Sequence, residues 1–453
     1  MKKFIIFICC AALLTVSLIM PASATDYATD VELYSKIDLL INTDSNTVII
    51  DRNGDQAADP SGLTKIMTAL VVLQSEKDLS RKITVSGSSF ESLYGTGSIM
   101  SGLQDGEVIS VHDLLCCMLI PGGNDAALVL ADTYGKGIPN FVSKMNAAAK
   151  KLGCSKTKFT DPHGLDGKSQ KSTAKDLAKI AAAAMKYSVF ETIVKSLTYD
   201  VPQTNKNEAR TIVSTNYMLN YGFPDYYYSD CKGIKTGASD AEGQSMISYA
   251  SRNGYTYLAV SLGGPYKDTD SDGDTENQAI LDVVRMFEWA FDNLSYEIVT
   301  KESQFVTTIP VNYCWDMDNV RLVAKNEVLA LVPEGNGSES VSFEPIDMPD
   351  ALNAPFKKGD TVCKAKIMFA DQQIGTVELV VAENANMSML LYLKAALKRM
   401  TASTVFKILV ILVVLAVGAY VALYIRANRR RKKNRELNMF KYSDLKNTTK
   451  NKK

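Results

Sequence analysis

The sequence predicts an α/β (α+β) region, a small all-β domain and one membrane-spanning helix, in that order along the chain. From about Asp26 to Leu294, segments with strand-like and helix-like apolar periodicity alternate. Beyond Ser303 only short strand-like segments remain, and Pro and Gly separate them, as is typical of a small all-β domain. Near the C-terminus, the 18 residues from Ile408 to Ile425 carry no charge, which favours a transmembrane helix.

The composition is that of an ordinary globular protein. The chain has 453 residues, 46% of them hydrophobic and 22% charged, and at about 150 residues per domain this length predicts two or three structural units. Its 50 Lys and Arg balance its 50 Asp and Glu, whereas nucleic-acid-binding proteins are usually basic, so we expect no nucleic-acid partner. With only two histidines, His112 and His163, a His-rich metal site is disfavoured. We expect neither a metal nor a cofactor.

Residues 1–24 have the pattern of a secretory signal peptide. Lys2 and Lys3 provide the positive start, Phe4–Met20 forms the apolar stretch, and Ala22-Ser23-Ala24 is a small-x-small cleavage site. The alternative is an uncleaved N-terminal anchor, which the cleavage pattern disfavours.

A transmembrane helix over residues 404–425 follows from length and flanking charge. At about 1.5 Å per residue, the uncharged segment spans about 27 Å, close to the thickness of the hydrocarbon core. Seven cations follow within ten residues, namely Arg426, Arg429, Arg430, Arg431, Lys432, Lys433 and Arg435. Because basic flanks stay in the cytoplasm, we expect residues 426–453 to form a cytoplasmic tail. Residues 386–403 are expected to form an amphipathic linker that can lie on the membrane surface.

Local patterns predict the individual elements of the two folded domains. In the first domain, residues 25–298, we expect strands at Ile37–Asn42, Thr47–Ile50, Gln244–Ser251 and Thr256–Leu262, and helices at Thr64–Gln74, Asn124–Tyr134, Ala174–Met185 and Gln278–Phe291. In the second domain, residues 303–383, we expect strands at Phe305–Val311, Val320–Ala324, Val328–Leu331, Thr361–Phe369 and Gly375–Val381.

The cysteines have no metal-ligand spacing. Two of the eight leave with the signal peptide. Cys116 and Cys117 lie in an apolar, helix-like run and are expected to be buried. Cys314 and Cys363 lie in the strand-rich region, where a disulfide between them is an open alternative.

Four short motifs occur in order along the first domain. They are residues 60–68 (PSGLTKIMT), which open a predicted helix, residues 121–127 (PGGNDAA), residues 161–166 (DPHGLD) and residues 233–237 (GIKTG), which precede a predicted strand pair. Behind a signal peptide, these motifs resemble the D-alanyl-D-alanine carboxypeptidases, the low-molecular-weight penicillin-binding proteins. The resemblance extends from about residue 30 to residue 383 and includes the β domain.

The resemblance implies a serine penicillin-binding/β-lactamase-like fold, in which helices cover both faces of an antiparallel sheet. In this family a serine in the first turn of a helix is the nucleophile, and a lysine three residues later accepts its proton. A second serine, in a Ser-x-Asn loop, relays protons. A Lys-Thr-Gly segment on an edge strand binds the terminal carboxylate of the substrate. The implied ligand is the peptidoglycan stem peptide ending in D-Ala-D-Ala.

Matching the motifs assigns these roles to residues of this chain. Lys65 matches the proton-accepting lysine and Asn124 matches the asparagine of the second motif. The segment Lys235-Thr236-Gly237 matches the carboxylate-binding strand. The backbone N–H groups of Gly62 and Ala238 match the oxyanion hole of the family.

The chain departs from the family pattern at both serines. Aligned on Lys65, the nucleophile falls on Gly62, and aligned on Asn124, the second serine falls on Gly122. Because glycine has no side chain to be acylated, the resemblance does not carry the activity across intact.

Two interpretations of this loss stay open. In the first, the chain is an active serine-type carboxypeptidase with Ser61 as a shifted nucleophile, since side chains four residues apart share a helix face. A shift of one residue turns the hydroxyl by about 100° and moves it by about 1.5 Å, and a misplacement of ~1 Å can cost about 100-fold in rate. Ser61 can instead cap the helix or be inert. In the second, the protein is a non-catalytic relative with a binding or regulatory role in cell-wall metabolism, which we favour on mechanism.

Three further alternatives are weaker. His163 with Asp161 or Asp166 resembles part of a catalytic triad, but a turn around Pro162 explains the same residues. Residues 268–273 (DTDSDG) match the first half of an EF-hand, but Ala279 stands where a bidentate Glu is needed, so we favour a solvated acidic loop. The protein could also be a structural spacer that uses only its β domain, but this function would not explain the Lys-Thr-Gly segment.

The predicted topology can be tested directly. We expect protease added to cells stripped of their wall to digest residues 25 to about 403 and to leave the tail beyond Ile425 as a small fragment, because the signal peptide and the basic flank place them on opposite sides of the membrane. Immunoblots against both parts measure this, and a protected ectodomain would contradict the topology.

Overall fold

The computed structural model describes residues 27, 30–165, 169–269, 273–369 and 372–450, without the side chains of residues 372 and 436–450. The predicted signal peptide, Asp166 and Asp270–Asp272 of the acidic segment lie outside these residues. The chain divides into two compact units. One contains residues up to 301 with 327–344 and 365–377, and the other contains residues 302–326, 345–364 and those from 378 onward. The domain boundaries predicted from the sequence stay predictions.

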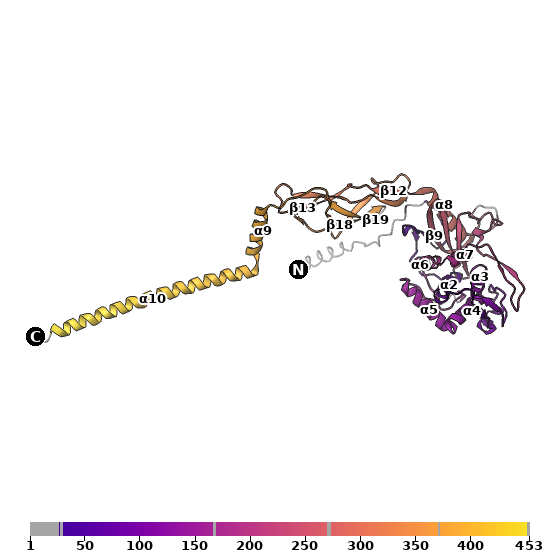
Figure 1. Ribbon diagram of the computed structural model, residues 1–453, viewed down its shortest axis with the longest axis horizontal. Helices are drawn as coiled ribbons and strands as arrows, with labels where there is room; N and C mark the ends of the chain where they lie inside the picture. The colour runs from indigo at the N-terminus through magenta and orange to yellow at the C-terminus, as the bar shows by residue number, and fades with distance from the viewer. Residues whose placement is uncertain (1–26, 28–29, 166–168, 270–272, 370–371, 451–453) are drawn as a thin grey trace, which may run out of the picture. The chain divides into compact units, whose positions relative to one another are not determined.

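A five-stranded antiparallel sheet forms the centre of the first unit (Figure 1). Its strands lie in the order β2 (Thr47–Arg52), β1 (Ile37–Asn42), β9 (Tyr255–Gly264), β8 (Gly243–Arg252) and β7 (Cys231–Ser239). β7 is therefore an edge strand, and such a strand has a free row of backbone groups that can pair with another chain.

Helices cover both faces of this sheet (Figure 1). Because side chains alternate along a strand, the neighbours Leu39 and Leu40 are both buried but belong to two different apolar clusters. The first cluster includes residues of α2 (Thr64–Ser75) and α6 (Ala174–Met185), and the second includes residues of α8 (Gln278–Asn293). The fold is therefore the penicillin-binding/β-lactamase-like arrangement that the motifs imply.

The helix α2 lies inside this fold rather than on its surface. All of its residues from Thr64 to Leu73 are buried. It continues from a 3-10 turn, η1 (Ser61–Leu63), and neither element has a side-chain cap. The other helices on this face are α3 (Val111–Leu119), α4 (Asn124–Gly135), α5 (Ile138–Lys151) and α7 (Ser188–Val194).

Short elements complete the first unit. The hairpins are β3 (Lys82–Thr84) with β4 (Val108–Ser110), β5 (Thr198–Val201) with β6 (Arg210–Val213), and β10 (Tyr266–Lys267) with β11 (Glu276–Asn277). The 3-10 turns are η2 (Gly87–Ser89), η3 (Glu91–Leu93) and η4 (Tyr217–Leu219).

Beyond α8 the chain is built of strands. β12 (Leu294–Thr300) pairs with β15 (Val328–Pro333). A six-stranded sheet has the order β16 (Ser342–Ile346), β18 (Thr361–Phe369), β19 (Gln372–Val381), β14 (Asn319–Ala324), β13 (Phe305–Asn312) and β17 (Leu352–Asn353). Along β14 the alternate residues Val320, Leu322 and Ala324 are buried, which is the pattern of a sheet with one face in an apolar core.

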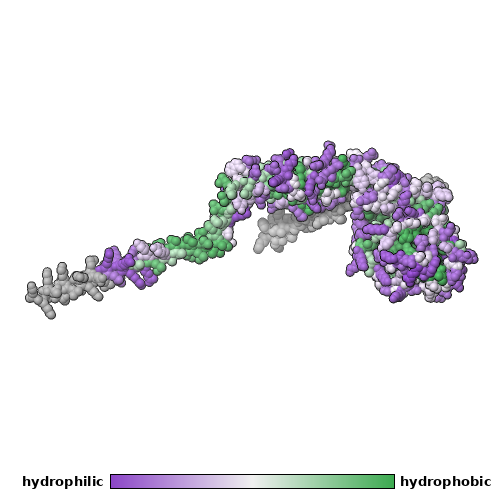
Figure 2. Space-filling model, viewed as in Figure 1, coloured by the Kyte–Doolittle hydropathy of each residue, from purple (hydrophilic) through white to green (hydrophobic). Residues whose placement is uncertain are grey.

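Two helices end the described chain, α9 (Met389–Ala402) and α10 (Thr404–Lys450). Residues Thr404–Arg435 are long and apolar enough to cross a membrane, and the protein buries none of their apolar stretch. Figure 2 shows a hydrophobic surface along α9 and the first part of α10, and a hydrophilic surface on the described part of α10 that follows. Tyr313 packs on α9, because its ring meets that of Tyr392 edge-on at 5.4 Å and lies 5.6 Å from the Arg399 guanidinium.

Most predicted elements are present. The helix predicted at Ala174–Met185 is α6 with the same bounds. The Lys-Thr-Gly segment precedes the predicted strand pair, β8 and β9, and lies on the edge strand β7, as the resemblance implied. Cys314 and Cys363 do not form a disulfide, since both thiols are free.

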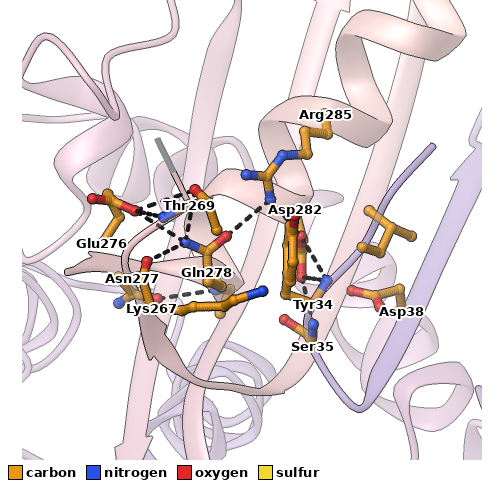
Figure 3. Close-up of polar contacts among 12 residues, drawn as sticks. Tyr34, Ser35, Asp38, Lys267, Thr269, Glu276, Asn277, Gln278, Asp282 and Arg285 are labelled. Atoms are coloured by element: carbon orange, nitrogen blue, oxygen red, sulfur yellow. Dashed lines mark hydrogen bonds and ion pairs between the residues drawn. The ribbon is translucent and has the colours of Figure 1, made fainter. Parts of the chain in front are cut away.

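A buried carboxylate joins the start of the described chain to α8 (Figure 3). Asp282 has no exposed surface, and it accepts hydrogen bonds from the backbone N–H groups of Tyr34 at 3.0 Å and Ser35 at 2.6 Å. The Arg285 guanidinium lies 2.8 Å from the same carboxylate. The Tyr34 ring also lies 4.0 Å from the Lys267 ammonium on β10. This cluster therefore connects β10 and the segment before β1 to α8.

We expect Asp282→Ala to lower the free energy of unfolding by about 3 kcal/mol, because it leaves buried donors and Arg285 without their acceptor. Urea unfolding of the full chain in detergent, followed by circular dichroism, measures this. Asp292→Ala on the same helix is the matched control, since Asp292 is 67% exposed and such positions usually change stability by about 0.5 kcal/mol or less. Equal effects of the two substitutions would contradict the role of Asp282.

Candidate functional site

The four sequence motifs meet at one cleft of about 330 Å³ in the first unit. Among the described residues that line it are Gly62, Lys65, Gly122, Asn124, Lys235, Thr236, Gly237 and Ala238. The 161–166 motif contributes its lining residues His163, Gly164 and Leu165. Ser61 is the one predicted site residue that is not among the described lining residues. Tertiary structure therefore brings the separate motifs to one place.

Lys65 lies in the first turn of α2, and the burial of that helix takes its side chain out of water. It is 4% exposed, and its Nζ donates a hydrogen bond to the backbone oxygen of His163 at 2.7 Å. Burial, with the positive charge of Lys235 in addition, lowers the pKa of Lys65 from 10.5 to about 7. A substantial fraction of this amine is thus uncharged near neutral pH and able to accept a proton.

Lys235 reaches the cleft from the edge strand β7. It is 3% exposed, and its Nζ donates to the Thr215 hydroxyl at 2.9 Å, which lies 2.8 Å from the Thr236 hydroxyl. Burial lowers the pKa of Lys235 from 10.5 to about 8. A cation flanked by two hydroxyls on an edge strand is suited to binding a peptide carboxylate. Thr215 lies in none of the four sequence motifs and was not predicted as a site residue.

Asn124 is the first residue of α4, and its side chain is 3% exposed. Its Nδ2 donates to the backbone oxygen of Ile99 at 3.1 Å, whereas its Oδ1 is buried without a partner among the described residues. The next residue, Asp125, accepts hydrogen bonds from Ser101 N and Oγ, both at 2.8 Å. Asp125 thereby holds the Ile99–Ser101 segment beside the start of α4.

Gly62 and Gly122, the two glycines at the predicted serine positions, differ in backbone conformation. A Cβ on Gly62 would lie 3.1 Å from Thr236 O and 3.3 Å from Gly237 Cα, so the neighbours would have to shift by a few tenths of an ångström. Gly122 has a φ of +86°, where side chains are strained, and a Cβ there would lie 3.4 Å from Lys235 Nζ. A serine therefore fits position 62 more readily than position 122.

Ser61 is 1% exposed, with a positive φ of 42°. Its N–H donates to the Asp59 carboxylate at 2.9 Å. Its Oγ is buried without a hydrogen-bond partner in the described part of the chain, and a Cβ on Gly237 would lie 2.4 Å from it. The hydroxyl therefore faces the β7 backbone, and it does not cap a helix.

His163 belongs to a turn, and its backbone rather than its ring serves Lys65. The Asp161 carboxylate accepts hydrogen bonds from the N–H groups of His163, at 2.9 Å, and Gly164. Gly164 has a φ of +89°, and a Cβ there would lie 1.8 Å from Ser61 O, so only glycine fits. The His163 ring lies 2.9 Å from Asp161, but the Ser61 hydroxyl that would complete a triad bonds to no described residue.

Comparisons with known proteins identify the family. Residues 23–265 match the family model described as D-alanyl-D-alanine carboxypeptidase, and residues 295–386 match the C-terminal domain of penicillin-binding protein 5. The D-alanyl-D-alanine carboxypeptidase DacC of Escherichia coli (strain K12) is 30% identical over 363 residues, which cover 76% of this chain and 83% of that protein. The chain belongs to the D-alanyl-D-alanine carboxypeptidase family.

Solved structures of this family have the same fold. Penicillin-binding protein 5 from Haemophilus influenzae superposes with a TM-score of 0.58 at 24% identity, covering 79% of this chain and 99% of that one. The Streptomyces K15 DD-transpeptidase has a TM-score of 0.52 at 29% identity, covering 58% and 99%. The family acts on D-Ala-D-Ala peptides, and this chain has a long apolar helix near its C-terminal end.

The low pKa of Lys65 predicts how stability depends on pH. Between pH 7 and about 10 the unfolded chain binds a proton that folded Lys65 does not, so stability should rise with pH in this window. We expect the Tm of the unmodified chain to rise between pH 7 and pH 9 relative to that of Lys65→Met. Lys77→Met, at an exposed position, should follow the unmodified chain. If the Tm of Lys65→Met and the Tm of the unmodified chain changed with pH in parallel, the lowered pKa of Lys65 would be refuted.

Proposed function

We propose that this protein is a membrane-anchored, extracytoplasmic member of the family that binds peptidoglycan stem peptides ending in D-Ala-D-Ala without cleaving them. Its role is then binding or regulation in cell-wall metabolism. The observation that carries the proposal is Gly62, three residues before Lys65, where the motif match predicts the family nucleophile. Acylation requires a nucleophilic oxygen within about 2.6–3.2 Å of its base, and Gly62 has no side-chain oxygen.

The remaining groups of the cleft support a binding function. As an edge strand, β7 can pair with a peptide as an added strand. Lys235 and Thr236, with Thr215, offer a cation and hydroxyl groups to the terminal carboxylate. The N–H groups of Gly62 and Ala238 are suited to hold a peptide carbonyl, as in the oxyanion hole of the family. Lys65 lines the same cleft, but position 62 offers it no hydroxyl to deprotonate.

The location follows from the two ends of the chain. We propose that residues 404–425 span the membrane, that residues 386–403 form the linker, and that the basic tail, residues 426–453, is cytoplasmic. The carboxypeptidase-like domain, residues 25–298, and the β domain, residues 303–383, then face the wall. This places the cleft on the same side of the membrane as peptidoglycan.

The second candidate function is an active carboxypeptidase with Ser61 as nucleophile. The observation in its favour is the strained φ of Ser61 with a hydroxyl that has no described partner, since backbone strain often occurs at active sites. Its 1% exposure and its position against Gly237 favour the non-catalytic alternative.

We expect the unmodified protein to form no stable covalent adduct with fluorescent penicillin, because position 62 carries no hydroxyl. Gly62→Ser should gain an adduct, since it places a hydroxyl one helical turn from Lys65. Gly62→Ser with Gly122→Ser tests the second serine, whose gain is limited by the strained backbone at position 122. Denaturing gels and peptide mapping measure labelling and locate it.

Two matched controls separate the alternatives. Gly62→Ala adds the same bulk without an oxygen and should stay unlabelled. Ser61→Ala should not change the behaviour of the unmodified protein or of Gly62→Ser. An adduct of the unmodified protein that maps to Ser61 and is lost in Ser61→Ala would refute the proposal and establish the active enzyme.

A further inference from the structure

A segment rich in exposed aromatic side chains borders the cleft. Between residues 214 and 228, all of which the structure describes, the exposed large apolar side chains are Tyr217, Tyr221, Phe223 and Tyr227. None of these four belongs to the two apolar clusters of the first unit. Tyr217 lines the cleft, and so does Tyr266 of β10, which is also exposed. Because exposed apolar side chains gathered in one place usually mark a binding surface, these rings call for a ligand.

The rings of this segment contact one another and the wall of the cleft. Tyr217 and Phe223 are stacked, with their ring centroids 4.3 Å apart and an interplanar angle of 23°. The ring of Tyr226 lies 5.8 Å from that of Tyr217, and its hydroxyl accepts a hydrogen bond from the backbone N–H of Asn277 at 2.9 Å. Asn277 itself lines the cleft. The aromatic surface is therefore continuous with the cleft.

The backbone that carries these rings closes into a loop. The N–H of Tyr228 donates to the backbone oxygen of Met218 at 3.0 Å, and both of these side chains are buried. Residues 217–227, which we call the aromatic loop, are thus fixed at both ends. Aromatic side chains have few rotatable bonds, so rings that are already stacked lose little conformational entropy when a ligand binds. The surface is therefore preformed.

The composition of this segment favours a sugar over an anion or a lipid surface. Residues 214–228 contain one charged residue, Asp225, and no Lys or Arg. Segments that lie on membranes are rich in Lys and Arg, and anionic ligands also require cations. A tyrosine side chain combines an apolar ring face with a hydroxyl that donates and accepts hydrogen bonds. A pyranose sugar has the complementary surface, with C–H groups on the faces of its ring and hydroxyls around the edge.

The ligand proposed for the cleft brings a sugar to this place. An extended peptide advances about 3.3 Å per residue, so a stem peptide leaves a cleft of about 330 Å³ within a few residues. What is attached to the peptide then lies on the surrounding surface. In peptidoglycan the stem peptide is attached to a glycan chain.

We propose that the aromatic loop binds the glycan chain of peptidoglycan, with sugar rings stacked on Tyr217 and Phe223. The peptide in the cleft and the glycan on the loop would be two parts of one ligand, so the protein would bind glycan-linked stem peptides more tightly than free ones. The choice of peptidoglycan as the source of the sugar rests on the proposed function, whereas the sugar site itself rests on the aromatic loop.

Isothermal titration of the full chain, in a detergent whose headgroup is not a sugar, tests the proposal with three probes. They are the β-1,4-linked tetramer of N-acetylglucosamine, a free stem peptide ending in D-Ala-D-Ala, and the same peptide joined to the disaccharide of peptidoglycan. We expect the tetramer to bind. We expect the sugar-linked peptide to bind on the order of tenfold more tightly than the free peptide, because two linked contacts reinforce each other.

Variants test the rings. Phe223→Ala should weaken binding of the tetramer on the order of tenfold and should remove the advantage of the sugar-linked peptide, without changing the affinity for the free peptide. Tyr217→Ala should also weaken the tetramer, whereas Tyr217→Phe, which keeps the ring, should retain most of the affinity. The matched control is Phe305→Ala on β13, because Phe305 is 56% exposed and belongs to the second unit. It should bind all three probes as the unmodified protein does.

Three results would overturn the proposal. They are no binding of the tetramer, which would leave a protein surface as the occupant of the aromatic loop, unchanged binding of the tetramer by Phe223→Ala, and an equal loss in Phe305→Ala. The first of these is measured on the unmodified protein and does not depend on any variant folding.

The free stem peptide separates this inference from the proposed function. If it binds without release of D-Ala but the tetramer does not bind, only the inference falls. If the tetramer binds through Phe223 but the free peptide does not bind, or releases D-Ala, the proposed function falls and the sugar site is supported.

Discussion

The burial of α2 is the constraint on which the site depends. This helix is enclosed from its first residue, so Lys65 is almost entirely buried and its hydrogen-bond partner belongs to the protein. The backbone oxygen of His163 is the acceptor that the fold provides, and it is in place because Gly164 lets its turn pack against Ser61. The burial of α2 therefore accounts both for the contact with the His163–Gly164 turn and for the lowered pKa of Lys65.

The fold accommodates glycine at both positions where the motif match predicts a serine. Gly62 is closely packed between Thr236 and Gly237, so a glycine there opens little space in the core. Gly122 adopts a left-handed conformation that glycine tolerates at no steric cost. Neither residue belongs to the two apolar clusters that hold the helices on the sheet. At these two positions, the residue type can therefore change the chemistry of the cleft with little effect on the stability of the fold.

The sequence predicted local features well and long-range partners poorly. The apolar period of residues 174–185 was enough to place α6. The apolar pattern alone did not predict β7, because its Gly-, Lys- and Thr-rich segment lacks the apolar alternation of a strand; the resemblance implied an edge strand there. Motif spacing located Lys65 and Lys235, but not Thr215 or the His163 oxygen. The His163 partner lies 98 residues from Lys65 in the chain, and such a contact exists only through tertiary packing.

A buried lysine with a lowered pKa can accept a proton or, when protonated, bind an anion. Which of the two occurs depends on whether a hydroxyl lies beside it. Beside a serine, the neutral amine accepts a proton and makes a nucleophile. Beside Gly62 there is no proton to accept, and the protonated amine becomes the more useful form because it can pair with an anion. Binding a carboxylate would then raise the pKa of Lys65 again, since an opposite charge stabilises the ammonium. On the proposed function, Gly62 therefore leaves Lys65 without a hydroxyl to activate.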